Sequence, residues 1–143
     1  RRSVASGRNR LIDRATLSMS AETMPVEIWH NPRCSQSRNA LALIRDAGIE
    51  PRIVEYATAS LSKARIAEVV AAAGLSMREA IREKDALFVE LGLAEPGVSD
   101  DALLEAMVAH PILINRPFVM TPVGTRLCRP PERVLDLLPS PTL

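Results

Sequence analysis

The stretch VEIWHNPRCSQSRN, residues 26–39, joins a predicted strand to a predicted helix. Residues 26–29 alternate apolar and polar side chains, as a strand with one buried face does. Residues 36–47 carry apolar side chains at helical spacing, and Gly48 closes that helix. Cys34 falls at the junction, where free backbone N–H groups and the positive end of the helix dipole favour a thiolate over a thiol. We therefore expect Cys34 to be a nucleophile.

Strand and helix patterns continue to alternate after this junction. Residues 52–56 form the next predicted strand, which makes a β-α-β unit with two parallel strands and a right-handed crossover. Ser62, Ser76 and Ser99 can each cap a helix. The helices expected after these serines cover residues 62–73, 76–91 and 100–109.

The last part of the chain predicts a hairpin and a helix. Two short apolar segments, residues 117–120 and 125–129, are separated by a connection that holds both a proline and a glycine, which is typical of a hairpin turn. Two prolines then precede a final predicted helix over residues 132–138. The sequence shows no internal repeat and no low-complexity tract.

This order of elements resembles the thioredoxin-like fold. The resemblance implies a three-layer α/β fold with a mixed central sheet and a helical insertion between the β-α-β unit and the C-terminal hairpin. In that fold the reactive cysteine opens the first helix, as Cys34 does here. A proline, usually cis, begins the third strand near that cysteine, and Pro117 occupies the matching place.

The length and composition favour one compact domain. A chain of 143 residues with 47% apolar side chains can bury one core and leaves little room for a second. Residues 1–23 hold five arginines and lack the apolar stretch of an export signal, so we expect a flexible extension before a start near Met24. The expected domain is residues 24–143.

The cysteine count and the charge pattern exclude several classes of protein. Two cysteines are too few for a disulfide scaffold, and no segment approaches the roughly 20 apolar residues of a membrane span, so we expect a reducing, soluble compartment, the cytoplasm. Residues 1–23 carry a net charge of +3, whereas the remainder, with 13 basic and 15 acidic residues, carries −2. Residues 24–143 are mildly acidic, and the chain has only one Trp, one Tyr and two Phe to stack on bases, so the sequence argues against nucleic-acid binding.

The motif around the cysteine resembles that of a specific protein family. Residues 30–39, HNPRCSQSRN, resemble the His-Asn-Pro-x-Cys-x-x-Ser-Arg-Asn signature of glutaredoxin-coupled arsenate reductases. The resemblance covers about residues 26–139. Its further blocks follow in the family's order as IREK at 81–84, LGLA at 91–94, HPILINRP at 110–117 and TPVGTRLCRP at 121–130.

The resemblance implies a reaction and a set of residues. In that family the cysteine thiolate, here Cys34, attacks arsenate to give a thiol-linked arsenic ester. Glutathione then displaces oxygen, arsenic goes from pentavalent to trivalent, and glutaredoxin clears the mixed disulfide. The implied partners are therefore arsenate, glutathione as co-substrate and glutaredoxin, with no bound cofactor. The arsenate-binding arginines of the family match Arg82, Arg116 and Arg129.

Two further residues match groups that stabilise the thiolate in that family. His30 matches a histidine thought to lower the cysteine pKa, and Ser37 matches a hydroxyl that can bond the sulfur. Arginines suit an oxyanion because each guanidinium offers paired donors in a planar fork. Taken singly, however, Arg82 in a charged helical stretch and the other two arginines would be read as ordinary surface residues.

Other thiol chemistries fit the spacing less well. A dithiol oxidoreductase needs Cys-x-x-Cys, but the fourth position is Ser37, and a phosphatase-type loop would place an arginine where the chain has Ala40. No Cys/His cluster has zinc spacing, so we expect no metal. Cys128 lies in an apolar hairpin segment and is expected to be a buried spectator.

Two alternative functions stay open. One is a binding module similar to redox-sensing regulators of the Spx type, which contact RNA polymerase and often carry the Cys-x-x-Cys pair absent here. The other is a thiol reductase of the same family that acts on another oxyanion or on a glutathionylated substrate. The motifs alone do not separate this last alternative from arsenate reduction.

Overall fold

The computed structural model of the chain describes residues 25–139. The expected extension over residues 1–23 lies outside this range. The elements, in chain order, are β1 (Glu27–Trp29), α2 (Ser35–Asp46), β2 (Arg52–Val54), α3 (Lys63–Ala72), α4 (Met77–Ala80), α5 (Ala86–Glu90), α6 (Asp100–Ala109), η2 (Pro111–Leu113), β3 (Phe118–Thr121), β4 (Gly124–Leu127) and η3 (Pro131–Leu137).

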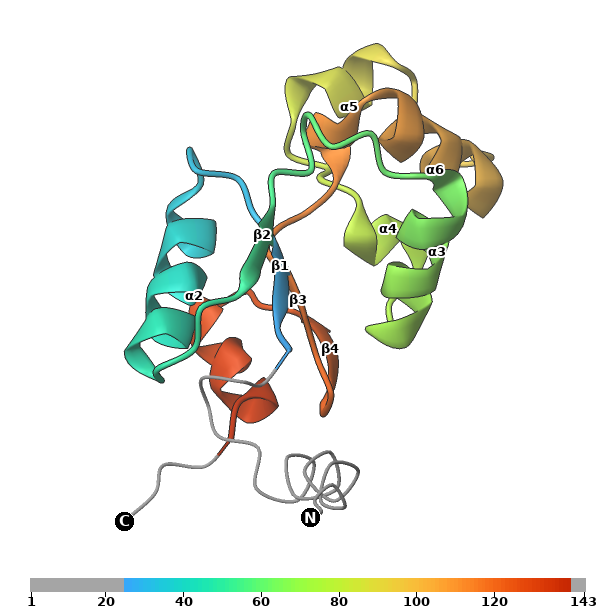
Figure 1. The fold of residues 1–143 in the computed structure, drawn as a ribbon. Coiled ribbons are helices and arrows are strands. Elements are labelled where there is room, and N and C mark those ends of the chain that lie inside the picture. The colour runs from blue at the N-terminus through green and yellow to red at the C-terminus, as the bar shows by residue number, and fades with distance from the viewer. Residues whose placement is uncertain (1–24, 140–143) are drawn as a thin grey trace, which may run out of the picture.

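A four-stranded mixed sheet lies at the centre of the molecule (Figure 1), with the strand order β2-β1-β3-β4. β1 pairs with β2 in parallel, so the predicted β-α-β unit is confirmed. β3 pairs with β1 and with β4 in antiparallel fashion, and the last two strands form the predicted hairpin. The β1–β3 pairing places β3, which comes late in the sequence, directly beside the strand that leads to Cys34.

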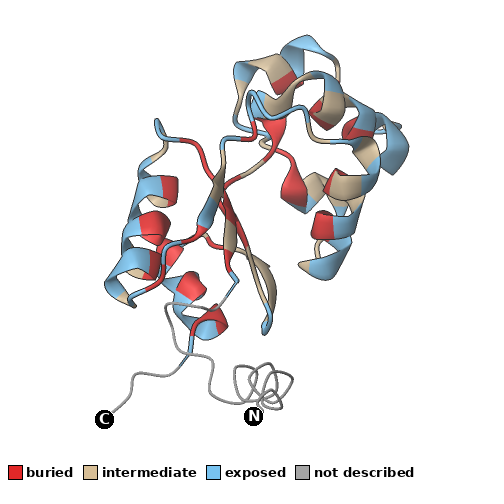
Figure 2. Cartoon of the chain, viewed as in Figure 1, coloured by how far each residue is buried: buried red, intermediate tan, exposed pale blue. Residues whose placement is uncertain are grey.

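Alternation along β1 and β3 divides the core into two clusters. Ile28 and Val119 pack on one face of the sheet with α2 and η3, and the buried side of α2 faces this layer (Figure 2). Trp29 and Phe118 pack on the opposite face, where their rings meet edge to face with centroids 5.8 Å apart. The molecule is therefore a three-layer α/β structure, as expected.

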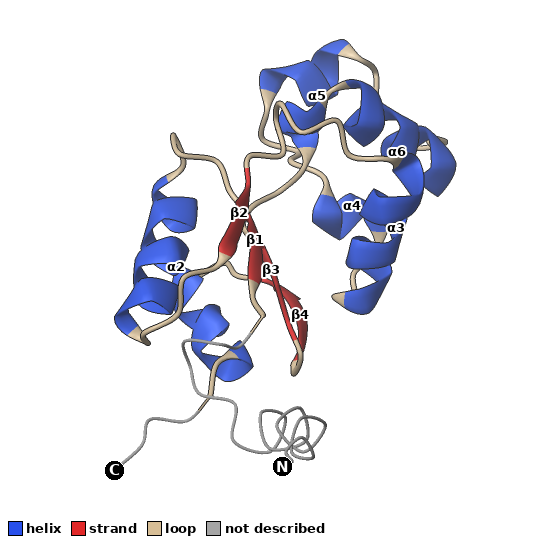
Figure 3. Ribbon diagram, viewed as in Figure 1, coloured by secondary structure: helices blue, strands red, loops and turns tan. Residues whose placement is uncertain are grey.

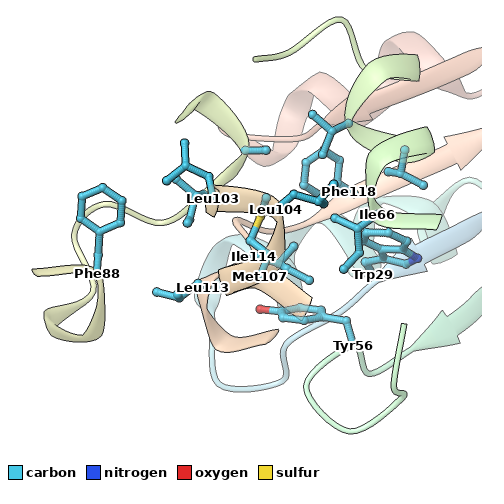
Figure 4. Close-up of a cluster of buried hydrophobic side chains, with 14 of the residues drawn as sticks. Trp29, Tyr56, Ile66, Phe88, Leu103, Leu104, Met107, Leu113, Ile114 and Phe118 are labelled. Carbon is cyan, nitrogen blue, oxygen red and sulfur yellow. The ribbon is translucent and has the colours of Figure 1, made fainter. Parts of the chain in front are cut away.

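The helical insertion between β2 and β3 covers the second face of the sheet. Leu103, Leu104 and Met107 of α6 pack into the cluster around Trp29 and Phe118 (Figure 4). The predicted serine caps are confirmed, because the hydroxyl oxygens of Ser62, Ser76 and Ser99 each accept a backbone N–H three residues ahead. The packed face of α6 holds the insertion against the sheet, and the caps set where its helices begin.

Two predicted helices differ from the observed ones. The stretch 76–91 does not form one helix: α4 ends at Ala80, Ile81 adopts an extended conformation, and Asp85 caps a new helix, α5 (Figure 3). The break is caused by a pairing distant in sequence, since Ile81 forms an isolated antiparallel bridge with Ile114. The final helix predicted over residues 132–138 is present as η3, a 3₁₀ helix that starts one residue earlier, at Pro131, and ends at Leu137.

The remaining fold predictions concern Pro117 and the membrane. The Arg116–Pro117 peptide bond is cis and precedes β3, as the thioredoxin-like resemblance implies, and the Arg129–Pro130 bond is also cis. Within residues 25–139, no helix has the length and apolar character needed to cross a membrane.

Candidate active site

Cys34 is the N-cap residue of α2 and is partly exposed. The loop from β1 turns at Asn31, whose carbonyl oxygen accepts the backbone N–H of Cys34 at 3.0 Å. Cys34 has extended backbone angles, φ −97° and ψ 122°, and helical residues begin directly after it. The thiol therefore lies at the first turn of α2, open to a small reactant.

The surroundings of the thiol favour its charged form. Burial raises the pKa of the Cys34 thiol, but the backbone N–H groups of Ser37 and Gln36 act in the opposite direction. The guanidinium groups of Arg129 and Arg116 also lower this pKa, and the pKa falls below the ordinary value for cysteine. A larger share of Cys34 is thiolate at neutral pH than in an unperturbed cysteine.

Arg129 links the hairpin to the cysteine. It follows β4, and its Nη1 lies 3.8 Å from Sγ of Cys34. The same Nη1 donates to the main-chain carbonyl oxygen of Arg116 at 2.8 Å. This second contact holds the guanidinium beside the sulfur, because it ties Arg129 to the segment that leads into β3.

Arg116 is buried, with 6% of its surface exposed. Its Nη1 donates to the carbonyl oxygens of Ile112 and Ile114 at 3.0 and 3.3 Å. Its Nε is buried and has no hydrogen-bond partner within the described part of the chain. A buried cation with an unsatisfied donor is costly without an anion, so Arg116 is suited to binding one.

Arg82 reaches the same region from the insertion. It lies in the break between α4 and α5, where its backbone N–H donates to the carbonyl oxygen of Leu113 at 2.7 Å, next to the bridge between Ile81 and Ile114. Arg82 and Arg129 line one cavity of about 430 Å³. The structure therefore brings Arg129 and Arg116 to Cys34, and it places Arg82 in the wall of a cavity that Arg129 shares.

His30 and Ser37 form a buried pair beneath the cysteine loop. Nδ1 of His30 lies 2.6 Å from Oγ of Ser37, and that oxygen also accepts the backbone N–H of Asn31 at 3.0 Å. Burial lowers the pKa of His30, an effect that Arg45 and Arg38 reinforce and Glu55 opposes, which favours a neutral imidazole. The two side chains thus brace the loop, and the group of Ser37 that lowers the pKa of Cys34 is its backbone N–H.

Two side chains at the site were not singled out from the sequence. Nδ2 of Asn31 donates to the hydroxyl of Tyr56 at 3.3 Å, and Oδ1 of Asn31 accepts the backbone N–H of Arg33 at 2.9 Å. Tyr56 is fully buried (Figure 4), and burial raises the pKa of its hydroxyl, an effect that the hydrogen bond from Asn31 and the charge of Arg116 oppose. The signal for Asn31 was its place inside the cysteine motif.

Cys128 is chemically different from Cys34. It is fully buried in the cluster around Ile28, and burial raises the pKa of its thiol to about 12. Both cysteines are free thiols. Cys128 is therefore a protonated core side chain in this structure, consistent with the spectator interpretation.

The sequence of this chain matches the model of a known protein family. The model of the ArsC family matches residues 29–137, which include Cys34 and all three arginines. The chain belongs to the ArsC family.

Several proteins similar to this ArsC-family chain are named arsenate reductases. An arsenate reductase of Rhizobium meliloti is 61% identical over 116 residues, which are 81% of this chain and 83% of the relative. An arsenate reductase of Escherichia coli is 48% identical over 114 residues, 80% of this chain and 81% of the relative. The structure of an arsenate reductase from Vibrio cholerae superposes with a TM-score of 0.77 at 43% identity, covering 80% of this chain and 98% of the other. The thioredoxin-like fold is thereby confirmed.

Proposed function

We propose that this ArsC-family protein is an arsenate reductase in which Cys34 is the nucleophile. The observation that carries the proposal is the contact of 3.8 Å between the Arg129 guanidinium and Sγ of Cys34, at a cysteine whose pKa is lowered by that cation and by helix N–H groups. A reactive thiolate that lies among cations is suited to an anionic electrophile. The names of the R. meliloti and E. coli relatives support arsenate as that electrophile.

The three arginines form the oxyanion site in this proposal. Arg116 offers a buried Nε that has no partner within residues 25–139, and Arg82 and Arg129 line the adjoining cavity. Guanidinium groups donate in a planar fork that matches two oxygens of a tetrahedral oxyanion. They also offset the negative charge that would otherwise repel the thiolate from arsenate.

The first chemical step forms a sulfur–arsenic bond. The Cys34 thiolate attacks pentavalent arsenic, one arsenic–oxygen bond breaks, and the departing oxygen takes up protons and leaves as water. The product is a thiol ester between the enzyme and As(V). The arginines and the first-turn N–H groups of α2 stabilise the negative charge on the oxygens during this step.

Reduction then uses two thiols from outside the chain. The sulfur of glutathione displaces a second oxygen from arsenic, again as water. A thiolate of glutaredoxin attacks that glutathione sulfur, the sulfur–arsenic bond breaks, and its electron pair stays on arsenic, which becomes As(III). Glutathione leaves as a mixed disulfide with glutaredoxin. Water then displaces Cys34 from As(III), which releases arsenite and restores the thiol.

His30 and Ser37 act as positioning residues in this account. Their contact at 2.6 Å and the bond from the Asn31 N–H to Ser37 Oγ fix the loop that carries Cys34. Since burial favours a neutral His30, its effect on the thiolate passes through loop geometry and not through a positive charge. We place the reaction in the cytoplasm, where the glutathione pool keeps the two free thiols reduced.

A turnover assay tests this function. Purified protein with arsenate, glutathione and glutaredoxin is expected to produce arsenite, and omission of glutaredoxin is expected to lower the rate at least about tenfold, because the As(V) adduct then lacks its reductant. Arsenite is measured by chromatography coupled to elemental detection. A protein whose Cys34 reacts readily with an alkylating agent but which yields no arsenite would contradict arsenate reduction and favour the alternative thiol substrates.

A further inference from the structure

Asn31 lies at the turn between β1 and Cys34, and each of its polar groups is bonded. Its main-chain N–H donates to Oγ of Ser37 at 3.0 Å, and its main-chain carbonyl oxygen accepts the N–H of Cys34 at 3.0 Å. Its side-chain Oδ1 accepts the N–H of Arg33 at 2.9 Å, which closes an Asx turn. Its Nδ2 donates to the hydroxyl of Tyr56 at 3.3 Å. Asn31 is buried, so the shape of the turn before Cys34 depends on these four bonds.

Tyr56 gives this turn its fixed point outside the loop. Three of the four bonds of Asn31 stay within residues 31–37, whereas the bond to Tyr56 reaches the segment that follows β2. The Tyr56 side chain has no exposed surface and packs in the cluster around Trp29 and Phe118 (Figure 4). Burial raises the pKa of its hydroxyl, so the group stays protonated at neutral pH and accepts the bond as a neutral partner. The position of the hydroxyl is therefore set by the core and not by the loop.

The orientation of the Asn31 amide connects this fixed point to the thiol. Oδ1 and Nδ2 belong to one planar group, so the bond from Nδ2 to Tyr56 also aims Oδ1 at the N–H of Arg33. Without the hydroxyl, the amide can rotate and the Asx turn loses part of its constraint. Sγ of Cys34 would then spend less time beside the first-turn N–H groups of α2, which lower the pKa of its thiol.

We propose that Tyr56 is a positioning residue for the nucleophile, because its hydroxyl orients the Asn31 amide and thereby holds Sγ of Cys34 at the first turn of α2. The proposal rests on the function proposed above, in which Cys34 attacks arsenate. Tyr56 itself does not touch the oxyanion, since its side chain has no exposed surface. Its hydroxyl is therefore expected to affect the reactivity of the thiol and kcat, and not the KM for arsenate.

Tyr56→Phe tests the proposal, because it removes the hydroxyl and keeps the buried ring. The rate at which iodoacetamide alkylates Cys34 is measured across pH, and its midpoint is expected to move to higher pH than in the wild type. In the turnover assay, kcat is expected to fall about fivefold while the KM for arsenate stays within about twofold. Arg116, Arg129 and the neutral His30 are unchanged in this variant, so the shift reports the position of the sulfur.

The matched control removes a hydroxyl at the opposite end of the sheet. Oγ1 of Thr121, the last residue of β3, donates to the carbonyl oxygen of Leu137 at 2.9 Å. Thr121→Val is expected to unfold at a lower denaturant concentration than the wild type, as Tyr56→Phe does, and to keep the wild-type midpoint and kcat. The same shift in both variants would overturn the proposal, because it would follow from lost stability. An unchanged midpoint in Tyr56→Phe would overturn it as well.

A double-mutant cycle decides whether Tyr56 acts through Asn31. Asn31→Ala is expected to raise the midpoint and to lower kcat at least as much as Tyr56→Phe does, and adding Tyr56→Phe to it is expected to change kcat by less than about 1.5-fold. Fully additive effects of the two substitutions would overturn the proposal. If Asn31→Ala does not fold, the comparison of Tyr56→Phe with Thr121→Val decides alone. Alkylation needs no arsenate, so a protein that fails in the turnover assay still gives the midpoint that tests Tyr56.

Discussion

Replacing Cys34 with serine is expected to lower the rate of arsenite formation at least about a thousandfold. A serine hydroxyl remains protonated at neutral pH, and the N–H groups and arginines that favour a thiolate at this position cannot make it an effective nucleophile. The loss is expected in kcat, because the variant keeps the arginines that bind the oxyanion. The measurement is the turnover assay with glutathione and glutaredoxin in excess.

The matched control is the second cysteine. Cys128→Ala removes a fully buried thiol whose pKa is raised to about 12, so it is expected to keep the wild-type rate and to lose about 1 kcal/mol of unfolding free energy. A Cys34→Ser protein that retains a tenth or more of the wild-type rate would contradict the assignment of the nucleophile. A Cys128→Ala protein that is folded but inactive would assign catalysis to both thiols.

Replacing Arg129 with alanine is expected to lower kcat/KM for arsenate about 10²–10³-fold. The substitution removes the cation that lies 3.8 Å from Sγ of Cys34 and the donor to the carbonyl oxygen of Arg116. It therefore raises the pKa of Cys34, so that less thiolate is present at neutral pH, and it weakens binding of the oxyanion. The two effects are separated by measuring the rate at several pH values, since higher pH restores only the thiolate.

Arg126 provides the control for Arg129. It lies on β4, and its guanidinium pairs with Asp136 at 3.0 Å on an exposed surface. Arg126→Ala removes the same charge from the same hairpin and is expected to change kcat/KM by less than about threefold. Equal losses in the two variants would show that the net charge of the hairpin, and not the contact of Arg129 with the thiol, determines activity.

Much of the fold could be predicted because its signals are local. The alternation before Cys34 and the glycine after the helix define β1 and α2 from neighbouring residues, and Gly48 indeed adopts a positive φ of 86°. The serine caps and the hairpin connection are equally local. The position of Cys34 at the N-terminus of α2, where backbone N–H groups lower the pKa of its thiol, could be predicted from the same local pattern.

The position of Arg82 could not be predicted in this way. The charged stretch around it has helical composition, yet Ile81 leaves the helix to pair with Ile114, more than thirty residues away. This pairing places Arg82 at a break next to the segment that carries Arg116. A pairing between distant residues leaves no periodic signal in the sequence, so the local pattern gave Arg82 the wrong secondary structure, and only the motif made it a candidate site residue.

The contacts of Tyr56 could not be predicted from the sequence for a related reason. The sequence placed it at the end of a strand, but β2 ends at Val54 and Tyr56 turns into the core, where its hydroxyl accepts a bond from Asn31. Whether a tyrosine at a strand end meets solvent or an active-site loop depends on packing between segments. The cavity lined by residues of the segment 78–84 could not be predicted from the sequence for the same reason, because Asn115 and Arg129, which complete its wall, are distant in the chain.

The central claim is that Cys34 is a thiolate held among cations that also bind the oxyanion. The most direct test is the rate at which iodoacetamide alkylates Cys34, followed by mass spectrometry across pH with and without arsenate. Because the pKa is lowered, the rate is expected to rise with pH and to reach its midpoint at a lower pH than the cysteine of an unstructured peptide does, and saturating arsenate is expected to slow it. A midpoint at or above that of the peptide together with no protection by arsenate would contradict the account.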